Sequence, residues 1–256
     1  MAIVNATDDS FYQKSRLNKR NLEDKIKKIK TLQPDIIDIG GQSTRPGAPL
    51  ITPKEEIARI VPVIERINNF FEGPISIDTF RSEVAEEAIK AGASIINDVS
   101  GGQLDAAIFD VAAQYKVPYV LTHMRGTPDT MQKQTDYQNL IVDLKQYFSE
   151  KIRQLHAAGV HDLILDPGSG FAKTPQKNLR LIKLLEQFRS FGYPVLIGVS
   201  RKSTIQRFLN TNAENALNGT SILHTLALQN GAGILRVHDI LEAQECIRLY
   251  EAYKNA

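Results

Sequence analysis

Acidic and amide side chains close several short apolar runs of the sequence. Asp78, Asn97 and Asp166 each stand at the end of such a run. A carboxylate accepts two N–H hydrogen bonds and a carboxamide both donates and accepts, so these groups suit a planar heterocycle with adjacent N–H donors and a carbonyl. Without a polar ligand, burying all three would cost free energy. The residues therefore predict a pocket for a guanine-like or pterin-like ring.

A second set of polar side chains is basic or hydroxylic. Arg236 and His238 are two residues apart on one apolar run, which places them on the same face of a strand. Ser200 and Lys202 precede a helical stretch, whose first N–H groups attract anions. This set predicts a phosphate or pyrophosphate site, where an amide oxygen could ligate a Mg²⁺ that keeps most of its waters. The full set is Asn5, Arg45, Ser200, Lys202, Arg236 and His238.

Other polar residues have structural interpretations. Asp105 and Asp239 precede helical stretches, where aspartate is typical of an N-cap or a turn. Asn97 and Asp98 are neighbours on one strand and point to opposite sides, so at most one of them faces a ligand. His224 lies inside a helical pattern, and we expect it to pack in the interior rather than act on a substrate.

Short β-branched runs alternate with amphipathic stretches along the chain. The runs are apolar throughout, which is typical of strands covered on both faces of a parallel sheet. Eight strands, each followed by a helix, predict an α/β chain that folds as one (β/α)8 TIM barrel over residues 1–256, with its active site at the carboxyl ends of the strands. A doubly wound open sheet is the alternative, because periodicity does not report closure. The predicted strands are 2–4, 35–39, 74–77, 93–99, 118–122, 162–165, 194–199 and 233–237, and the predicted helices are 22–32, 53–71, 82–91, 105–115, 137–158, 175–191, 213–229 and 240–253.

The composition is that of a globular protein, with 42% hydrophobic and 23% charged residues. The formal net charge of +2 gives no overall field toward nucleic acid. No apolar run approaches the ~20 residues of a membrane-spanning helix. The one cysteine, Cys246, forms neither an internal disulfide nor a multi-thiolate zinc site. We therefore expect small-molecule substrates, no nucleic-acid or membrane partner, and a location in the cytoplasm.

Motifs at the strand ends resemble those of the dihydropteroate synthase family, in order and over essentially the whole chain. The resemblance implies a TIM-barrel transferase of folate biosynthesis. Such an enzyme condenses 6-hydroxymethyl-7,8-dihydropterin diphosphate with p-aminobenzoate and releases 7,8-dihydropteroate and pyrophosphate, with Mg²⁺ as cofactor. The matching strings are MAIVNATDDSF at 1–11, DIGGQSTRPGA at 38–48, ISIDTFR at 75–81, IINDVSGG at 95–102, THMRGTPDTMQ at 122–132, LDPGSGFAKT at 165–174, GVSRKS at 198–203 and ILRVHD at 234–239.

The resemblance also implies roles for individual residues. Those expected to bind the pterin are Asp78, Asn97, Met124, Asp166, Phe171, Gly198 and Lys202. Those expected at the pyrophosphate are Asn5, which is also the expected metal ligand, Thr44, Arg45, Arg236 and His238. Those expected at p-aminobenzoate are Phe11, Thr44, Pro46, Ser200 and Lys202, and those expected to act in catalysis are Arg45, Asp78, Lys202 and Arg236.

The implied reaction is a dissociative displacement that leaves a delocalised dihydropterin cation. Mg²⁺ with Arg236 and His238 would stabilise the departing diphosphate, and a weak aniline nucleophile would then suffice without a general base. Closure of the loops after the first two strands would exclude water. In this family sulfonamides are competitive mimics of p-aminobenzoate, and homodimers form through the late helices.

The chain departs from the family pattern at three places. Asp8 replaces a proline, Gln13 stands where aspartate is common, and Gln42 replaces a glutamate. The chain also starts on the first strand, so we expect the family's N-terminal barrel-bottom segment to be missing. A catalytically impaired pterin-binding paralogue is one alternative function. The pterin-binding barrel of methyltetrahydrofolate methyltransferases is another, and a third makes Lys202 the Schiff-base lysine of an aldolase-type barrel.

Overall fold

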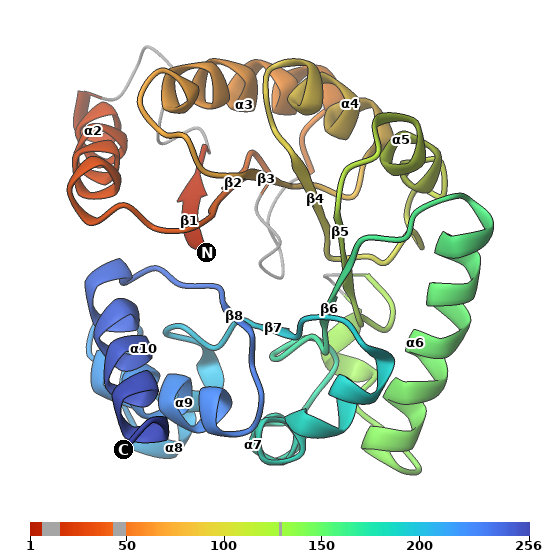
Figure 1. Ribbon diagram of the computed structural model, residues 1–256, viewed down its shortest axis with the longest axis vertical. Helices are drawn as coiled ribbons and strands as arrows, with labels where there is room; N and C mark the ends of the chain where they lie inside the picture. Colours follow the sequence, from red (N-terminus) through yellow and green to blue (C-terminus); the bar gives the residue numbers. More distant parts are fainter. Residues whose placement is uncertain (7–15, 43–49, 128–129) are drawn as a thin grey trace. The chain divides into compact units, whose positions relative to one another are not determined.

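The computed structural model describes residues 1–6, 16–42, 50–127 and 130–256, with side chains from residue 22 onward in the second of these ranges. The chain forms two compact units. Unit 1 comprises Met1–Leu121 and Gln154–Asp162, and unit 2 comprises Thr122–Arg153 and Leu163–Ala256. Each unit contains its own strands and the helices that cover them, coloured along the chain in Figure 1.

Unit 1 alternates strands with helices, and strands β1 to β5 pair in parallel in the order of the sequence. Because all five run the same way, their carboxyl ends lie at one edge of the sheet. Helices α3, α4 and α5 pack side by side along it (Figure 1). The elements are β1 (Ala2–Asn5), α2 (Arg16–Leu32), β2 (Ile37–Gly40), α3 (Pro53–Asn68), β3 (Ile75–Asp78), α4 (Ser82–Lys90), β4 (Ile95–Asp98), α5 (Ile108–Tyr115) and β5 (Tyr119–Thr122).

Burial explains why these short runs form strands. Ile37, Ile39, Ile75 and Ile77 have no exposed surface or almost none, so each strand is covered on both faces as its apolar sequence predicts. The first helix after β2 begins at a defined signal. Thr52 accepts a hydrogen bond from the backbone N–H of Glu55, whose side chain accepts one from the Thr52 N–H, so a capping box fixes the start of α3.

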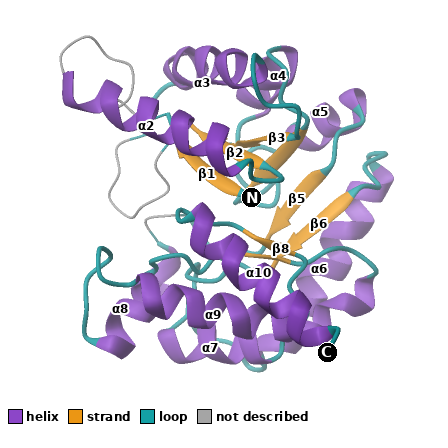
Figure 2. Ribbon diagram, turned by 60° about the vertical axis from the view of Figure 1, so that its left-hand side comes forward, coloured by secondary structure: helices purple, strands orange, loops and turns teal. Residues whose placement is uncertain are grey.

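Unit 2 contains one four-residue strand and two strands of two residues, and Figure 2 distinguishes its strands from its helices by colour. Strands β7 and β8 pair in parallel over two residues each, and Leu165 of β6 forms a single parallel bridge with Val195. Helices α9 and α10 pack together. The elements are η1 (Met131–Lys133), α6 (Leu140–Ala157, whose last turn belongs to unit 1), β6 (Leu163–Asp166), α7 (Pro175–Lys183), η2 (Leu185–Phe191), β7 (Leu196–Ile197), α8 (Ser203–Leu209), α9 (Leu217–Gln229), β8 (Ile234–Leu235) and α10 (Ile240–Lys254).

The described residues confirm all eight predicted strands and the α/β alternation. The helix predicted over 175–191 is instead an α-helix followed by a 3-10 helix, because Leu184 leaves the helical region at φ −111° and ψ 18°. Helix α8 confirms the helical stretch expected after Ser200 and Lys202, although it was not one of the eight helices that follow the predicted strands. Within the described ranges, none of the helices has the length and apolar content needed to cross a bilayer.

Candidate active site

In unit 1 the register of the sheet aligns polar residues from three strands. Asn5 is paired with Gly40, Gly40 with Asp78, and Asp78 with Asn97. Residues in register on parallel strands point to the same side of the sheet, so an acid and two amides share one face at the carboxyl edge. Asn5 is exposed, Asp78 is half-buried and Asn97 is buried. The sheet therefore presents Asp78 and Asn97 as neighbours on adjacent strands.

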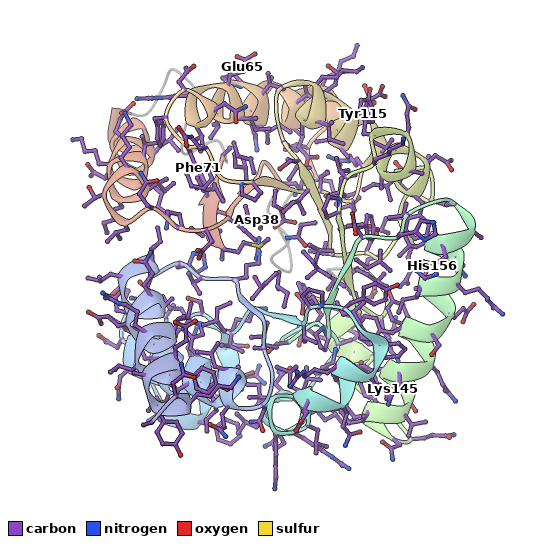
Figure 3. All side chains as sticks on the ribbon, viewed as in Figure 1. Asp38, Glu65, Phe71, Tyr115, Lys145 and His156 are labelled. Atoms are coloured by element: carbon purple, nitrogen blue, oxygen red, sulfur yellow. The ribbon has the colours of Figure 1, made fainter. Side chains whose placement is uncertain are left out.

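A buried acid that the sequence-based site omits fixes the orientation of Asn97. Asp38, on β2 (Figure 3), has no exposed surface, and its two oxygens lie 3.2 and 3.1 Å from the Asn97 Nδ2. The amide nitrogen donates to both carboxylate oxygens, so this nitrogen faces Asp38. The Asn97 carbonyl oxygen is then directed elsewhere, and no described residue donates to it. Asp38 could have been found by alternation, because it lies two residues before Gly40 on the same face of β2.

Asp98 has a different environment from Asn97, as the strand alternation predicts. Its carboxylate accepts from the Ser100 N–H at 2.7 Å, the Gly102 N–H at 2.6 Å and the Tyr119 hydroxyl at 2.5 Å. Burial raises the pKa of Asp98, and these three hydrogen bonds oppose the rise. The carboxylate is occupied by its own chain, so Asp98 is a structural residue.

In unit 2, Asp166 closes β6 and is surrounded by positive charge. Its Oδ1 accepts the Gly168 N–H at 2.8 Å, and none of the residues that the structure describes donates to Oδ2. Burial raises the pKa of Asp166, opposed first by the charge of Lys202 and further by Arg236 and Lys173. A buried acid with a free acceptor oxygen is suited to bind a ligand through its N–H groups.

Lys202 is the residue just before α8, at its N-cap position. Its Nζ donates to the Ser169 carbonyl at 2.5 Å and lies 5.1 Å from the centre of the Phe171 ring, within range of a cation–π interaction. A Cβ atom at Gly198 would lie 3.6 Å from this Nζ and 3.8 Å from the Arg236 Cβ. A side chain at position 198 would therefore contact both residues, and glycine leaves this space open.

Apolar side chains lie beside this charged group. Met124, Met131 and Ala172 form a buried cluster, against which the half-buried Phe171 packs. Since the same Phe171 ring faces Lys202, an apolar surface and a cation meet at one place. Unit 2 thus brings together the predicted residues Met124, Asp166, Phe171, Gly198, Lys202 and Arg236.

The segment after β7 is held by contacts from distant parts of unit 2. The Ser200 hydroxyl accepts the His238 N–H at 3.3 Å, which joins two residues predicted for different ligands. Arg201, at φ 53°, donates to both Asp239 oxygens at 2.8 and 3.0 Å. Asp239 does occupy the N-cap position of α10, but its carboxylate makes no capping bond there. The expected side-chain cap by Asp239 therefore does not form. Its carboxylate binds the Arg201 guanidinium instead, because a bidentate charged donor is the stronger partner.

Asp105 behaves closer to expectation. One carboxylate oxygen accepts the N–H and the hydroxyl of Ser82, the first residue of α4, and the other accepts the Ala107 N–H. Asp105 therefore accepts from donors at the N-terminus of α4 as well as from the backbone of its own turn.

Several predicted residues lie outside the described part of the chain. These are Phe11, Thr44, Arg45 and Pro46, together with the departures Asp8 and Gln13.

Asn5 is the only residue that we predicted as a metal ligand. Its exposed carboxamide stands at the carboxyl end of β1, and the described residues contain no cluster of three or more histidine, cysteine or acidic side chains suited to a metal. Mg²⁺ keeps several waters and is commonly held by one or two protein oxygens together with substrate phosphates. One exposed amide oxygen fits a metal that arrives with a diphosphate, and it does not fit a permanently bound one.

Comparison with known proteins identifies the family. A model of pterin-binding enzymes matches residues 1–238. The dihydropteroate synthase of Synechocystis sp. is 42% identical over 258 aligned positions, which cover 98% of this chain and 89% of that protein. The chain belongs to the dihydropteroate synthase family.

Solved structures of family members confirm the predicted fold class. The Yersinia pestis dihydropteroate synthase, solved with a sulfonamide drug complex, superposes with a TM-score of 0.92 at 35% identity, over 100% of this chain and 94% of that one. The Xanthomonas albilineans enzyme with 4-aminobenzoic acid gives 0.91 at 34% identity, over 100% and 92%. The fold is therefore the α/β TIM barrel of this family, as the eight strand–helix repeats predict.

Proposed function

We propose that this chain condenses 6-hydroxymethyl-7,8-dihydropterin diphosphate with p-aminobenzoate to form 7,8-dihydropteroate and pyrophosphate, a step of folate biosynthesis. The observation that supports this most directly is the environment of Asp166, a buried acid with one free oxygen next to Lys202 and Arg236. Such a group binds a ring that presents N–H donors and at the same time tolerates a neighbouring polyanion.

The pterin-binding roles that the resemblance implies are proposed for the residues of each unit by itself. Asp166 would accept from the N–H groups of the ring, while the Asn97 amide, oriented by Asp38, would offer its free carbonyl oxygen. Asp78 shares the face of Asn97 and would add a second acid. Lys202 would donate to the ring carbonyl. Further residues proposed to line the ring are Met124, Phe171 and Gly198.

The diphosphate is proposed to bind the basic set. Arg236 would neutralise the charge that develops on the leaving group, and the exposed His238 would add a donor. Mg²⁺ bound at Asn5 would supply Lewis-acid stabilisation of the diphosphate oxygens. Thr44 and Arg45 are proposed for the same ligand from the sequence alone. With the departing charge stabilised, the dihydropterin carbon reacts as a cation, so no general base is assigned.

The p-aminobenzoate site is proposed around Ser200 and Lys202, with Phe11, Thr44 and Pro46 assigned from the resemblance. Family members with 4-aminobenzoic acid and with a sulfonamide bound support this ligand class. We expect sulfonamides to compete with p-aminobenzoate here too. The Ser200 hydroxyl is held in place by the His238 N–H, which orients it as a donor toward a carboxylate.

Homodimer formation and a cytoplasmic location are also proposals. Large apolar side chains are exposed on the two last helices, and such a surface is typical of a protein contact. They are Ile222 and Leu226 on α9 and Leu241, Leu249 and Tyr253 on α10. Helices α9 and α10 are the late helices through which we expect two copies to associate.

The deciding experiment is release of pyrophosphate from the two purified substrates, with Mg²⁺ omitted and then restored. We expect turnover that depends on both substrates and on Mg²⁺, and inhibition by a sulfonamide that is relieved by added p-aminobenzoate. Tight pterin binding without turnover would instead identify a catalytically impaired paralogue. Turnover unaffected by a chelator would contradict the role given to Asn5 and Mg²⁺.

A further inference from the structure

Lys173 is a charged side chain in the interior that neither the predicted site nor the proposed mechanism uses. It is 3% exposed. Its Nζ lies 3.0 Å from the Gly168 carbonyl, 3.1 Å from the Phe171 carbonyl and 3.1 Å from Nδ1 of His123, which is itself buried. A buried ammonium requires partners, and these three acceptors match its three N–H donors.

The turn that Lys173 holds contributes three groups to the proposed pterin site. The Gly168 N–H binds Asp166, the Ser169 carbonyl accepts from Lys202, and the Phe171 ring faces Lys202. The turn is packed tightly as well, because a Cβ atom at Gly168, whose φ is 72°, would lie 2.0 Å from the His123 carbonyl oxygen. A shift of this turn would therefore displace Asp166, Lys202 and Phe171 relative to one another.

A second connection joins the same turn to the helix that follows Lys202. The Gly170 N–H donates to Oδ1 of Asn178 at 2.9 Å, and the Asn178 Nδ2 donates to the Thr204 hydroxyl of α8 at 2.9 Å. Lys173 therefore fixes one side of the turn while Asn178 fixes the other. From this geometry we infer that Lys173, together with His123, is a positioning residue that holds the 168–171 turn so that Asp166, Lys202 and Phe171 meet one pterin ring.

A covalent role for Lys173 is excluded by the same contacts. All of its donors are engaged and the side chain has almost no exposed surface, so its nitrogen has no path to a substrate. The role is also separate from that of Lys177, four residues later. The half-buried Lys177 donates to the Thr135 carbonyl and its Nζ lies 5.4 Å from the Tyr137 ring centre. Within the described part of the chain it forms no hydrogen bond with residues 168–171.

The charge of Lys173 has a consequence that can be measured. Burial lowers its pKa to about 7, with Lys202 and Arg125 adding to the effect and Asp166 opposing it. Burial and the charge of Lys173 lower the pKa of His123 well below its usual range, so the imidazole is neutral. Near neutral pH Lys173 then loses its proton, and with it one donor and one positive charge beside Asp166.

The other groups facing Lys173 do not reproduce this behaviour. Tyr137, whose ring centre lies 6.0 Å from Nζ, has a pKa raised by burial to about 12 and stays neutral. Loss of a proton from Asp166 would create an acceptor for the ring, so pterin affinity would rise with pH. Loss of a proton from Lys173 loosens the turn, so affinity falls as pH rises past about 7. The two groups act in opposite directions.

The test compares Lys173→Met with Lys177→Met, the same change at a neighbouring lysine. The ligand is 6-hydroxymethylpterin, which carries no diphosphate that could titrate. Its binding is measured by calorimetry from pH 6 to 8.5. We expect wild-type affinity to fall as pH rises past about 7 and Lys177→Met to behave alike. Lys173→Met should bind about tenfold more weakly at low pH and show no such decline, because the ammonium and its hydrogen bonds are absent.

His123→Phe provides a second variant should Lys173→Met fail to fold. The phenylalanine ring would still pack against Tyr147, whose ring centre lies 4.8 Å from that of His123. Lys173 would lose one acceptor for its ammonium, so the decline in pterin affinity should begin at lower pH. The inference depends on the proposed pterin site, and the two fail differently. A wild-type protein that does not bind pterin contradicts the proposed function. Unchanged affinity and pH profile in both variants would refute the role of Lys173 alone.

Discussion

Asp98 of unit 1 and Asp166 of unit 2 are the same residue type at the same place, the end of a buried parallel strand. Burial raises the pKa of both. Asp98 is surrounded by three hydrogen-bond donors from its own chain, whereas Asp166 has one such donor and three nearby basic side chains. The first arrangement completes a loop, and the second leaves an oxygen for a ligand. The position of a carboxylate in the fold therefore does not show its role, and its partners do.

The two acids should respond oppositely to the loss of their charge. At Asp166 the cost falls on ligand binding, because its free oxygen has nothing else to bind. At Asp98 the cost falls on folding, because Ser100, Gly102 and Tyr119 would lose an acceptor in the interior.

The largest effect is expected for Asp166→Asn. An amide offers one acceptor and two donors in place of two acceptors, so it mismatches the N–H groups of the ring. We expect kcat/KM to fall by about 100-fold, the size seen when one partner of a buried charged hydrogen bond is removed. The midpoint of urea unfolding should change little, because burial of this charge is itself unfavourable. Full activity in the variant would contradict the site.

Lys202→Met should have a somewhat smaller effect. The change removes the hydrogen bond to the Ser169 carbonyl and the cation over Phe171 while keeping an unbranched side chain of similar length. We expect kcat/KM to fall by about tenfold to 100-fold, since one charged donor to the substrate is lost. Lys177→Met is the control. If both variants retain wild-type turnover, Lys202 does not contact the substrate.

Much of this contrast could be predicted from the sequence, and part of it could not. Continuous β-branched runs located every strand among the described residues, and alternation separated Asn97 from Asp98. Alternation would also have identified Asp38. The burial of Lys173 could not be predicted, because its partner His123 is 50 residues earlier in the chain. The Arg201–Asp239 pair, 38 residues apart, could not be predicted for the same reason. Because of this ion pair, Asp239 does not form the expected capping hydrogen bond. Local patterns identify elements, whereas partners distant in sequence decide what a polar group does.

Asp98→Asn should leave catalysis intact and lower stability. An asparagine nitrogen cannot accept, so at least one of the donors on Ser100, Gly102 and Tyr119 would be buried without a partner. We expect the free energy of unfolding to fall by about 2 kcal/mol, with kcat/KM per folded molecule unchanged. Tyr119→Phe, which removes a single donor, should cost less. A large loss of turnover without a loss of stability would reverse the assignment of the two acids.

His224 offers the smallest and sharpest test, because it is a buried titratable group with no ligand role. Its Nε2 has no hydrogen-bond partner among the described residues, and burial lowers its pKa to about 4. The folded chain holds His224 neutral while the unfolded chain takes up a proton near pH 6.5, so stability is present above that pH and declines as pH falls toward 4. Between pH 7 and 5.5 this group alone should cost about 1 kcal/mol in the free energy of unfolding. In His224→Leu this part of the decline should disappear, measured by urea unfolding across that range, while pterin affinity is unchanged. An undiminished decline in the variant would show that the pH dependence comes from other groups, and an altered pterin affinity would show that burial without partners can also accompany function.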